Sequence, residues 1–367
     1  MQAQSDYPIL MKNKMRIILP FLLMAMIFEG CGSNYKEIYP RYAECPIENN
    51  LTSTDTISCD SVYLRYPYRI AIEDSLAVVL DLHPDTYFLH AFTYPDWRPI
   101  TSFGQRGKGP EDILSAERVR ICSADSIWVL DSNRKQLTRW AVSASAGTAS
   151  RLEEINLDQR LIRTLDFCKS ENGFIVPDYT GNYRYHLLDS RGNIMESCGN
   201  IPTEIPVADE HKIALAQAWR SFMDYNPKNN VLAMVTQLGE VIETFNLKTG
   251  EHHVLYGPGG EPEFKISQGY GLPIGIMGFT DVQVTEDKIF TIFQGVSMQE
   301  IAHNLQLGLS TPDGGRFLYT FSITDLFLHC QKLNHLICGF TITQKEKAIA
   351  ALDVNKDNSI IYFNLPD

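Results

Sequence analysis

Short runs of apolar residues, each preceded by Asp or Asn, recur along the chain. The runs begin after Asp74, Asp125, Asn172, Asn229, Asp287 and Asn334, at intervals of 47 to 58 residues. Asp and Asn tolerate the backbone of tight turns, and the apolar residues that follow are often β-branched, as in buried strands. The pattern predicts a hairpin turn leading into a buried strand six times over. Such intervals are typical of the four-stranded blades of a propeller rather than of helical repeats.

Each repeat has room for four short strands separated by turns. We expect blades over residues 69–103, 118–157, 164–198, 221–256, 281–322 and 328–365. Val62 and Leu64 precede the first blade in an alternating pattern and are expected to add a strand that closes the ring, because an unclosed ring leaves exposed strand edges. Residues 208–222 have the apolar spacing of a helix. The predicted fold class is all-β: a six-bladed β-propeller of four-stranded antiparallel blades.

The N-terminal region has the pattern of an export signal. Basic residues in 11–16 precede an apolar run over 17–28, whose helical length of about 18 Å is too short to cross a bilayer. The following Gly30-Cys31 resembles the end of a bacterial lipobox, in which the cysteine is lipidated, although Phe28 and Glu29 depart from the usual residues. The alternative is a plain secretory signal with an incidental cysteine. We divide the chain into an upstream extension and signal peptide (1–30), lipidated Cys31 with a flexible tether (31–60), and the propeller (61–367).

Composition and motifs argue against several classes of protein. The net charge is −12 and no run of Lys and Arg occurs, so we expect no nucleic-acid partner. The histidines and cysteines show no zinc-ligand spacing, and no GxSxG motif is present. Cys122, Cys168 and Cys338 lie in expected strands and are predicted to be buried. We predict no cofactor, while leaving open a central divalent metal (Ca or Zn) held by side chains from several blades.

Arginines recur where the innermost strands of four blades are expected to begin: Arg69, Arg118, Arg163 and Arg220. These positions surround one mouth of the channel, so the arginines are candidates to bind a carboxylate or an acidic glycan. Aromatic and amide side chains expected on the same face are candidates to contact a sugar or peptide: Tyr179, Tyr183, Trp219, Phe279 and Gln294. The alternative is that the arginines form ion pairs with neighbouring carboxylates and the aromatic residues pack in the interior.

A glycine-rich segment, residues 103–113, is the most distinctive motif. It lacks the pattern of a phosphate-binding loop and is expected to link the first blade to the second. Together with the repeated Asx hairpins and the lipobox, it resembles the six-bladed β-propeller lipoproteins of Bacteroidetes, which are related to TolB-like and NHL-type propellers. The resemblance covers residues 60 to 367. It implies a fold and an envelope location, but no ligand and no catalytic residues.

These observations predict an envelope-anchored lipoprotein, in the outer membrane and facing the periplasm or the cell surface. Its propeller is expected to bind a glycan, a peptide or a protein at the channel mouth, with the insertion at residues 294–304 overhanging that mouth. No catalytic residues are predicted. The alternatives are a metal-dependent enzyme of the lactonase or lyase type and a structural subunit of an envelope assembly.

Overall fold

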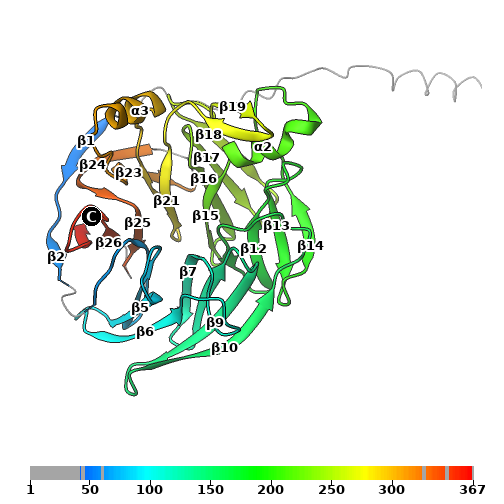
Figure 1. Ribbon diagram of the computed structural model, residues 1–367. Coiled ribbons are helices and arrows are strands. Elements are labelled where there is room, and N and C mark those ends of the chain that lie inside the picture. Colours follow the sequence, from blue (N-terminus) through cyan, green and yellow to red (C-terminus); the bar gives the residue numbers. More distant parts are fainter. Residues whose placement is uncertain (1–41, 43–45, 59–61, 325–327, 344–346, 366–367) are drawn as a thin grey trace, which may run out of the picture. The chain divides into compact units, whose positions relative to one another are not determined.

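Six antiparallel sheets surround a central axis in the computed structural model (Figure 1). The structure describes residues 42, 46–58, 62–324, 328–343 and 347–365, so the predicted signal peptide and Cys31 lie outside it. Within the described residues, no helix is long and apolar enough to cross a membrane. The six sheets around one axis confirm the predicted all-β, six-bladed propeller.

Blades one to three follow the chain, with the innermost strand first in each. Blade one contains β3 (Pro67–Glu73), β4 (Leu76–Asp81), β5 (Tyr87–Thr93) and β6 (Pro99–Gln105). Blade two contains β7 (Ala116–Ser123), β8 (Ser126–Asp131), β9 (Gln136–Ser143) and β10 (Thr148–Asn156). Blade three contains β11 (Cys168–Lys169), β12 (Gly173–Pro177), β13 (Tyr185–Asp189) and β14 (Ile194–Cys198).

Blades four and five carry additional elements. Blade four contains β15 (Ser221–Asn226), β16 (Val231–Thr236), β17 (Val241–Asn246) and β18 (His252–Tyr256), and the hairpin β19 (Phe264–Ser267) and β20 (Tyr270–Pro273) follows it. Blade five contains β21 (Phe279–Val284), β22 (Lys288–Phe293), β23 (Gly315–Ser322) and β24 (Leu328–Ile337). The short helix η1 (Asp209–His211) and helix α2 (Lys212–Ala218) precede blade four, and α3 (Met298–Gln306) lies between β22 and β23. The predicted helix over 208–222 is therefore shorter than expected.

Blade six closes the ring with a strand from the N-terminal part of the chain. It contains β25 (Gly339–Ile342), β26 (Ala348–Leu352) and β27 (Ile360–Asn364), and β2 (Asp55–Ile57) pairs antiparallel with β27 as its outermost strand. β1 (Ile47–Leu51) adds a fifth, parallel strand to β24. The closing strand is thus not formed by Val62 and Leu64, which lie in a loop. The predicted boundary at residue 61 is wrong for the same reason, because two strands lie inside the predicted tether.

The boundary between blades five and six also differs from the prediction. β24 is the outer strand of blade five and continues through Cys338 directly into β25. The predicted sixth repeat at 334–340 therefore covers the end of β24, the crossover at Cys338 and the start of β25. The other five Asx residues lie at or next to the hairpin between the first two strands of a blade: Asp74, Asp125, Asn172, Asn229 and Asp287.

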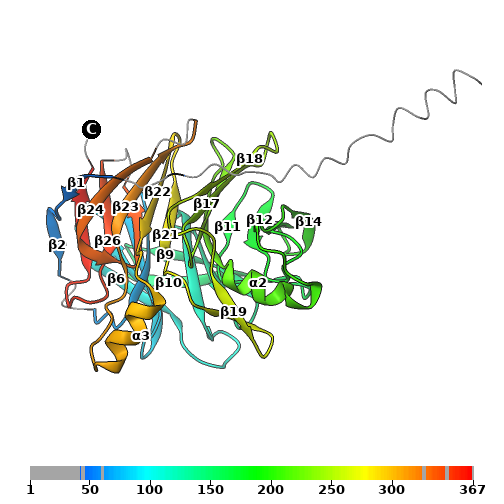
Figure 2. The ribbon, with the colours of Figure 1, turned by 90° about the horizontal axis from the view of Figure 1, so that it is seen from above.

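The ring has two chemically different faces. All innermost strands run in the same direction, so they begin at one face and end at the other. We call the face where they begin the insertion face, because α2, the β19–β20 hairpin and α3 all project there, on the lower side in Figure 2. We call the opposite face, where each innermost strand turns into the second strand, the hairpin face.

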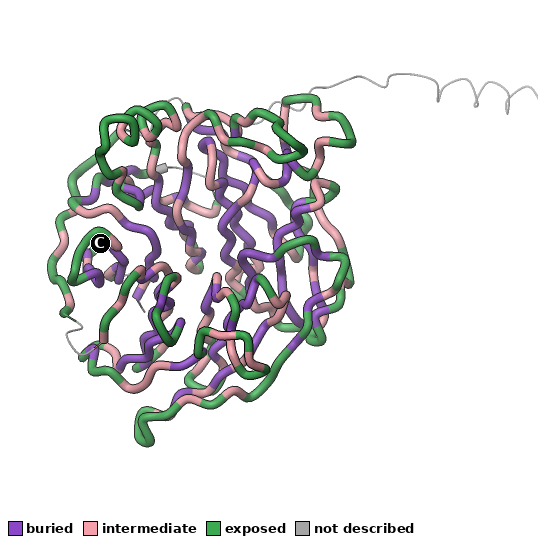
Figure 3. The backbone as a smooth tube through the Cα atoms, in the orientation of Figure 1, coloured by how far each residue is buried: buried purple, intermediate pink, exposed green. Residues whose placement is uncertain are grey.

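The core lies between neighbouring blades, which cover both sides of each sheet (Figure 3). The second strands are consequently almost entirely apolar: in β4 and in β16 every residue is buried, and only the last residue, Asp81 or Thr236, is polar. The predicted glycine-rich link joins β6 to β7. Gly104 there has φ +68°, and a Cβ at this position would lie 2.8 Å from Leu89 Cδ1, so glycine lets the link turn away from the packed blade.

Candidate functional site

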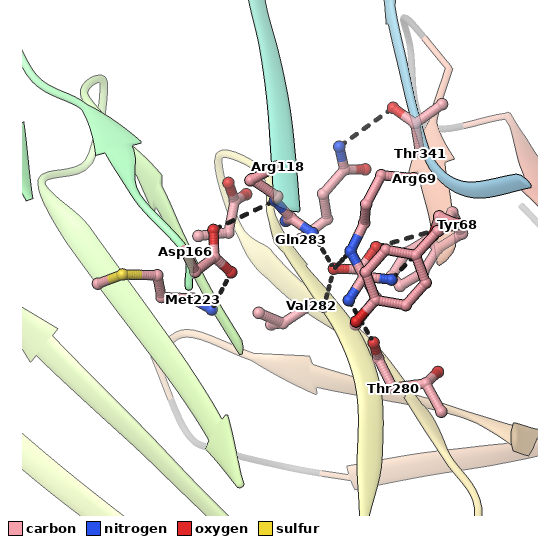
Figure 4. A network of polar contacts seen from close by, with 12 residues as sticks. Tyr68, Arg69, Arg118, Asp166, Met223, Thr280, Val282, Gln283 and Thr341 are labelled. Carbon is pink, nitrogen blue, oxygen red and sulfur yellow. Dashed lines mark hydrogen bonds and ion pairs between the residues drawn. The ribbon is translucent and has the colours of Figure 1, made fainter. Parts of the chain in front are cut away.

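Three aspartates and three arginines form ion pairs in the channel where the innermost strands begin. Figure 4 shows Arg69, Arg118 and Asp166 of this network. The six residues come from blades one to five: Arg69, Arg118, Arg120, Asp166, Asp224 and Asp281. Their side chains are at most 15% exposed to solvent. The equal numbers of positive and negative groups allow these charges to be buried, because each has a partner.

Asp281 connects four blades. Arg118 Nη1 donates a hydrogen bond to Asp281 Oδ1 at 2.7 Å, and Arg69 Nε lies 3.9 Å from the same oxygen. The other carboxylate oxygen accepts from the backbone N–H of Phe340 in blade six at 3.3 Å. Burial alone would raise the pKa of Asp281, but the two guanidinium groups outweigh burial and lower it. Asp281 is therefore an ionised, structural carboxylate at neutral pH.

Asp166 and Asp224 extend the network through blades two to five. Asp166 lies 3.3 Å from Arg118 Nε and accepts from the backbone N–H of Met223 at 3.1 Å. Asp224 pairs with Arg120 and accepts from the N–H of Val284 at 2.8 Å. Burial raises the pKa of Asp224, although Arg120 acts in the opposite direction. These bonds hold the inner strands together across the axis.

A central divalent metal stays a prediction, and the residues of the network can be compared with what such an ion requires. The channel carboxylates Asp166, Asp224 and Asp281 are each already paired with guanidinium groups. In the described part of the chain, no three His, Cys, Asp or Glu side chains are arranged to hold a metal. This donor set does not fit a divalent cation, so we derive no chemistry through one.

A cavity of about 500 Å³ lies in the channel on the hairpin-face side of this network. All six innermost strands line it, and Arg69 and Arg118 lie at its floor. Its upper wall and rim are formed by residues at the ends of these strands and in the turn after β15: Glu73, Cys122, Lys169, Asn226, Lys228, Gln283 and Ile342. The volume falls within the range of roughly 300 to 1,000 Å³ that is usual for small-molecule sites.

Lys169 is the cation of the rim that lacks an ion pair. Its Nζ donates to the carbonyl oxygen of Ser170 at 2.5 Å and lies 5.2 Å from the centre of the Phe174 ring. The described part of the chain places no carboxylate within ion-pair distance of it, whereas Lys228 on the same rim pairs with Glu286. Partial burial lowers the pKa of Lys169. An incoming anionic group would restore the favourable interaction that burial removes.

Glu73 and Cys122 lie at the same rim. Burial raises the pKa of Glu73, and the neighbouring Asp74 adds to this shift while Lys228 opposes it. Burial also raises the pKa of Cys122, and Lys169 opposes that shift. The thiol is nevertheless accessible, so the prediction that Cys122 is buried is wrong, while Cys168 and Cys338 are buried as predicted. The rim therefore combines a cation, a carboxyl group and a thiol around a polar opening.

The predicted site residues separate into different environments. Arg69 and Arg118 are paired inside the channel rather than placed at an open mouth. Phe279 packs in the core against Phe293 and Tyr319, and Trp219 has no exposed surface, so neither can stack against a ligand in this structure. Gln294 is half-buried at the end of β22. The insertion at 294–304 contains the start of α3, which lies at the outer edge of the ring in Figure 1 rather than over the channel.

Arg163, Tyr179 and Arg220 do lie close together on the insertion face. Tyr179 is buried, which raises the pKa of its hydroxyl to about 12, against the opposing effects of Arg220, Arg184 and Arg163. Among the described residues, its hydroxyl has no hydrogen-bond partner, and the same holds for Thr164 Oγ1 and Trp219 Nε1. Arg163 is exposed and forms no ion pair with any described residue. The ligand-binding role of this group stays a prediction.

Sequence reasoning missed the residues of the cavity itself. Side chains alternate in direction along a strand, so the position of Arg118 implies that Arg120 and Cys122 also point to the channel. Counting in steps of two from Arg69 along the same strand likewise leads to Glu73. The alternation of side chains could therefore have predicted this part of the cavity lining, provided that the strand ends were placed correctly.

The fold and its polar central cavity define a six-bladed β-propeller with a channel site. The family model described as TolB-like 6-blade propeller-like matches residues 48–345, so the chain belongs to this family. A search of curated proteins finds no match.

Two solved structures from Bacteroides are similar to this chain. One is a candidate exported protein of Bacteroides fragilis, with a TM-score of 0.57 and 12% identity over 90% of this chain and 100% of that chain. The other is a member of the DUF4221 family from Bacteroides vulgatus, with a TM-score of 0.55 and 9% identity over 86% of this chain and 97% of that chain. At these identities the likeness shows the fold alone.

Proposed function

We propose that this protein is an envelope-anchored binding protein whose central cavity takes a small polar ligand with an anionic group, such as an acidic glycan or an acidic peptide. The observation that carries the proposal is the cavity of about 500 Å³, lined by all six blades, with Lys169 unpaired by any described carboxylate at its rim. The N-terminal export pattern and Cys31 support an outer-membrane lipoprotein that faces the periplasm or the cell surface. The candidate exported protein among the structural neighbours agrees with this location.

The polar lining favours binding over catalysis. Gln283 Nε2 donates to Thr341 Oγ1 at 3.1 Å, and Gln283 also accepts from the backbone of Ile342, so this part of the wall is held rigidly by its own bonds. Rigid polar groups around a preformed cavity reduce the conformational cost of binding. A metal-dependent lactonase or lyase reaction finds no support in the paired carboxylates at the cavity floor.

The test is a thermal-shift screen of the full chain with acidic saccharides and short acidic peptides. A ligand present at 100 times its Kd raises the free energy of unfolding by about 2.7 kcal/mol. For a domain of this size, this corresponds to a rise in Tm of roughly 4 °C. We expect at least one compound to raise the Tm of the wild type and not that of Lys169→Met, which keeps the apolar stem of the side chain and removes its charge.

Lys248→Met is the matched control. Lys248 is exposed in the outer turn of blade four, and no described carboxylate pairs with its side chain. This variant should respond to the compound as the wild type does. The proposal fails if no compound in the panel shifts the Tm, or if Lys169→Met responds as strongly as the wild type.

A further inference from the structure

Exposed apolar side chains gather on the insertion face. The large apolar residues that lie there and are more than one-third exposed include Ile162, Ile205, Ile213, Ile266, Tyr270, Leu272, Leu305, Leu307 and Leu309. Those away from this face are Ile47, Leu152 and Met195. The turns of the hairpin face are instead built from residues such as Asp74, Asn172 and Lys248. One side of the ring is therefore apolar at its projecting parts, and the side with the cavity is polar.

The projecting elements show the same arrangement individually. In the β19–β20 hairpin, Lys265 is paired with Leu272 and Ser267 with Tyr270, so Leu272 and Tyr270 share one face with Lys265. Tyr270 is 61% exposed and Leu272 is 51% exposed. An aromatic and an aliphatic side chain beside a lysine suit the boundary between lipid headgroups and acyl chains, since the lysine stem can bend toward the phosphates.

Helix α3 buries none of its residues, and exposed leucines lie in its last turn and directly after it. Ser297 caps the helix by accepting from the N–H of Glu300 at 3.0 Å, so the element is locally ordered. Leu305 is 64% exposed and Leu307 is 60% exposed. The apolar groove between the segment 205–211 and the β19–β20 hairpin has a volume of about 310 Å³ and opens on the same face.

The N-terminal segment joins the propeller on this face. The backbone N–H of Tyr42 donates to Tyr256 O at 3.0 Å, and its hydroxyl donates to Glu240 Oε1 at 2.8 Å, both at the insertion-face ends of their strands. Only ten residues lie between Cys31 and Tyr42. Even fully extended, they reach about 40 Å. A bilayer that holds the chain through Cys31 therefore lies within about 40 Å of Tyr42, which is bound at the insertion face.

We infer that the insertion face rests on the lipid bilayer, with Tyr270, Leu272 and the leucines at the end of α3 and after it in the headgroup region. The inference rests on the proposed membrane anchoring and not on the proposed ligand. A fluid bilayer suits this surface because the apolar residues are carried by separate elements, and a bilayer does not require a matching shape. Arg163, exposed beside Ile162, is available for a lipid phosphate. The cavity then opens away from the membrane.

The face also carries acidic residues, which shape the expected lipid dependence. Glu210, Glu263 and Glu300 are exposed on the same elements. They oppose a general attraction to anionic lipids, so contact should be driven by apolar burial. We expect binding of this face to zwitterionic phosphatidylcholine vesicles and little effect of salt.

Depth-dependent fluorescence quenching tests the orientation in the full chain. The four native tryptophans are at most 8% exposed and provide a constant background. Tyr270→Trp places a reporter on the insertion face, and Thr249→Trp places one in an exposed turn of the hairpin face as the matched control. In phosphatidylcholine vesicles with brominated acyl chains, we expect the added emission of Tyr270→Trp to be quenched and that of Thr249→Trp to be retained.

A second variant separates this face from the N-terminal anchor. Leu272→Ser with Leu305→Ser, in the Tyr270→Trp background, should lose the quenching while the Tm and vesicle flotation stay unchanged. The inference is overturned if the chain does not float with vesicles, if neither reporter is quenched, or if both are quenched equally. Ligand stabilisation through Lys169 is measured separately, so failure of this inference leaves the proposed ligand site untouched.

Discussion

Removal of the Asp281 carboxylate should destabilise the propeller more than removal of any exposed carboxylate. In Asp281→Ala, Arg69 loses its nearest carboxylate and Arg118 keeps only Asp166, at 3.3 Å. Removing one partner from a buried ion pair costs about 3 to 5 kcal/mol, because the remaining charge stays buried. The unfolding entropy is about 2.1 cal/mol/K per residue, summed over roughly 320 residues. A loss of 1 kcal/mol in the free energy of unfolding therefore lowers the Tm by about 1.5 °C. The expected fall in Tm is therefore about 5 to 8 °C.

Thermal unfolding followed by circular dichroism, repeated in urea, provides the measurement. Asp96→Ala is the control, because Asp96 pairs with Arg98 at 2.9 Å where both side chains are more than half exposed. Such a pair contributes at most about 1 kcal/mol. The double variant Arg118→Met, Asp281→Leu should lose less stability than the two single changes together predict. If Asp281→Ala behaves like Asp96→Ala, the network does not hold the blades together as described.

Two further predictions concern the periphery of the ring. The Asp178 carboxylate accepts hydrogen bonds from the backbone N–H groups of Thr180 and Tyr183 and from the side chain of His186. Burial would raise the pKa of Asp178, but these hydrogen bonds lower it to about 2. Since its unfolded pKa is about 3.9, its stabilisation is present above that value and is lost as pH falls toward 2. By urea unfolding, Asp178→Asn should cost about 2 kcal/mol at pH 6 and progressively less as pH falls through 2. A difference independent of pH would contradict this. Removal of residues 1–57 deletes β1 and β2 and leaves blade six with three strands and an open edge. The Tm of this variant should therefore fall by several degrees. Removal of residues 1–41 is the control and should leave the Tm unchanged.

The blade pattern was predictable because both faces of a second strand are covered. The first five residues of β4 and of β16 form an apolar run after an Asx turn, and the spacing of such runs indicates the number of blades. The sixth repeat was misplaced because β24 and β25 are joined through Cys338 without a polar turn, so their apolar residues form one continuous pattern. β1 and β2 were missed because most of their residues are exposed at the ring's edge and show no alternation.

The channel was predictable only in part. Arg69 and Arg118 could be placed near the axis from strand spacing, but their shared partner Asp281 lies in blade five, 163 residues from Arg118. Whether an arginine at a strand start faces solvent or a distant carboxylate depends on which blades meet across the axis. That information is in the closed ring and not in any local pattern. Lys169 has the same property, because only the closed ring shows that it has no paired carboxylate in the described residues.

Alkylation of Cys122 tests most directly whether the cavity is the ligand site. Cys122 is exposed at the cavity rim, and Cys198, which is half-buried in β14, serves as an internal reference in the same chain. The rate of iodoacetamide labelling at each cysteine would be followed by peptide mass spectrometry, with and without a compound that raises the Tm. The predicted result is slower labelling of Cys122, an unchanged rate at Cys198, and no protection in Lys169→Met. A stabilising compound that leaves the Cys122 rate unchanged would show that the ligand binds elsewhere and would contradict the central claim.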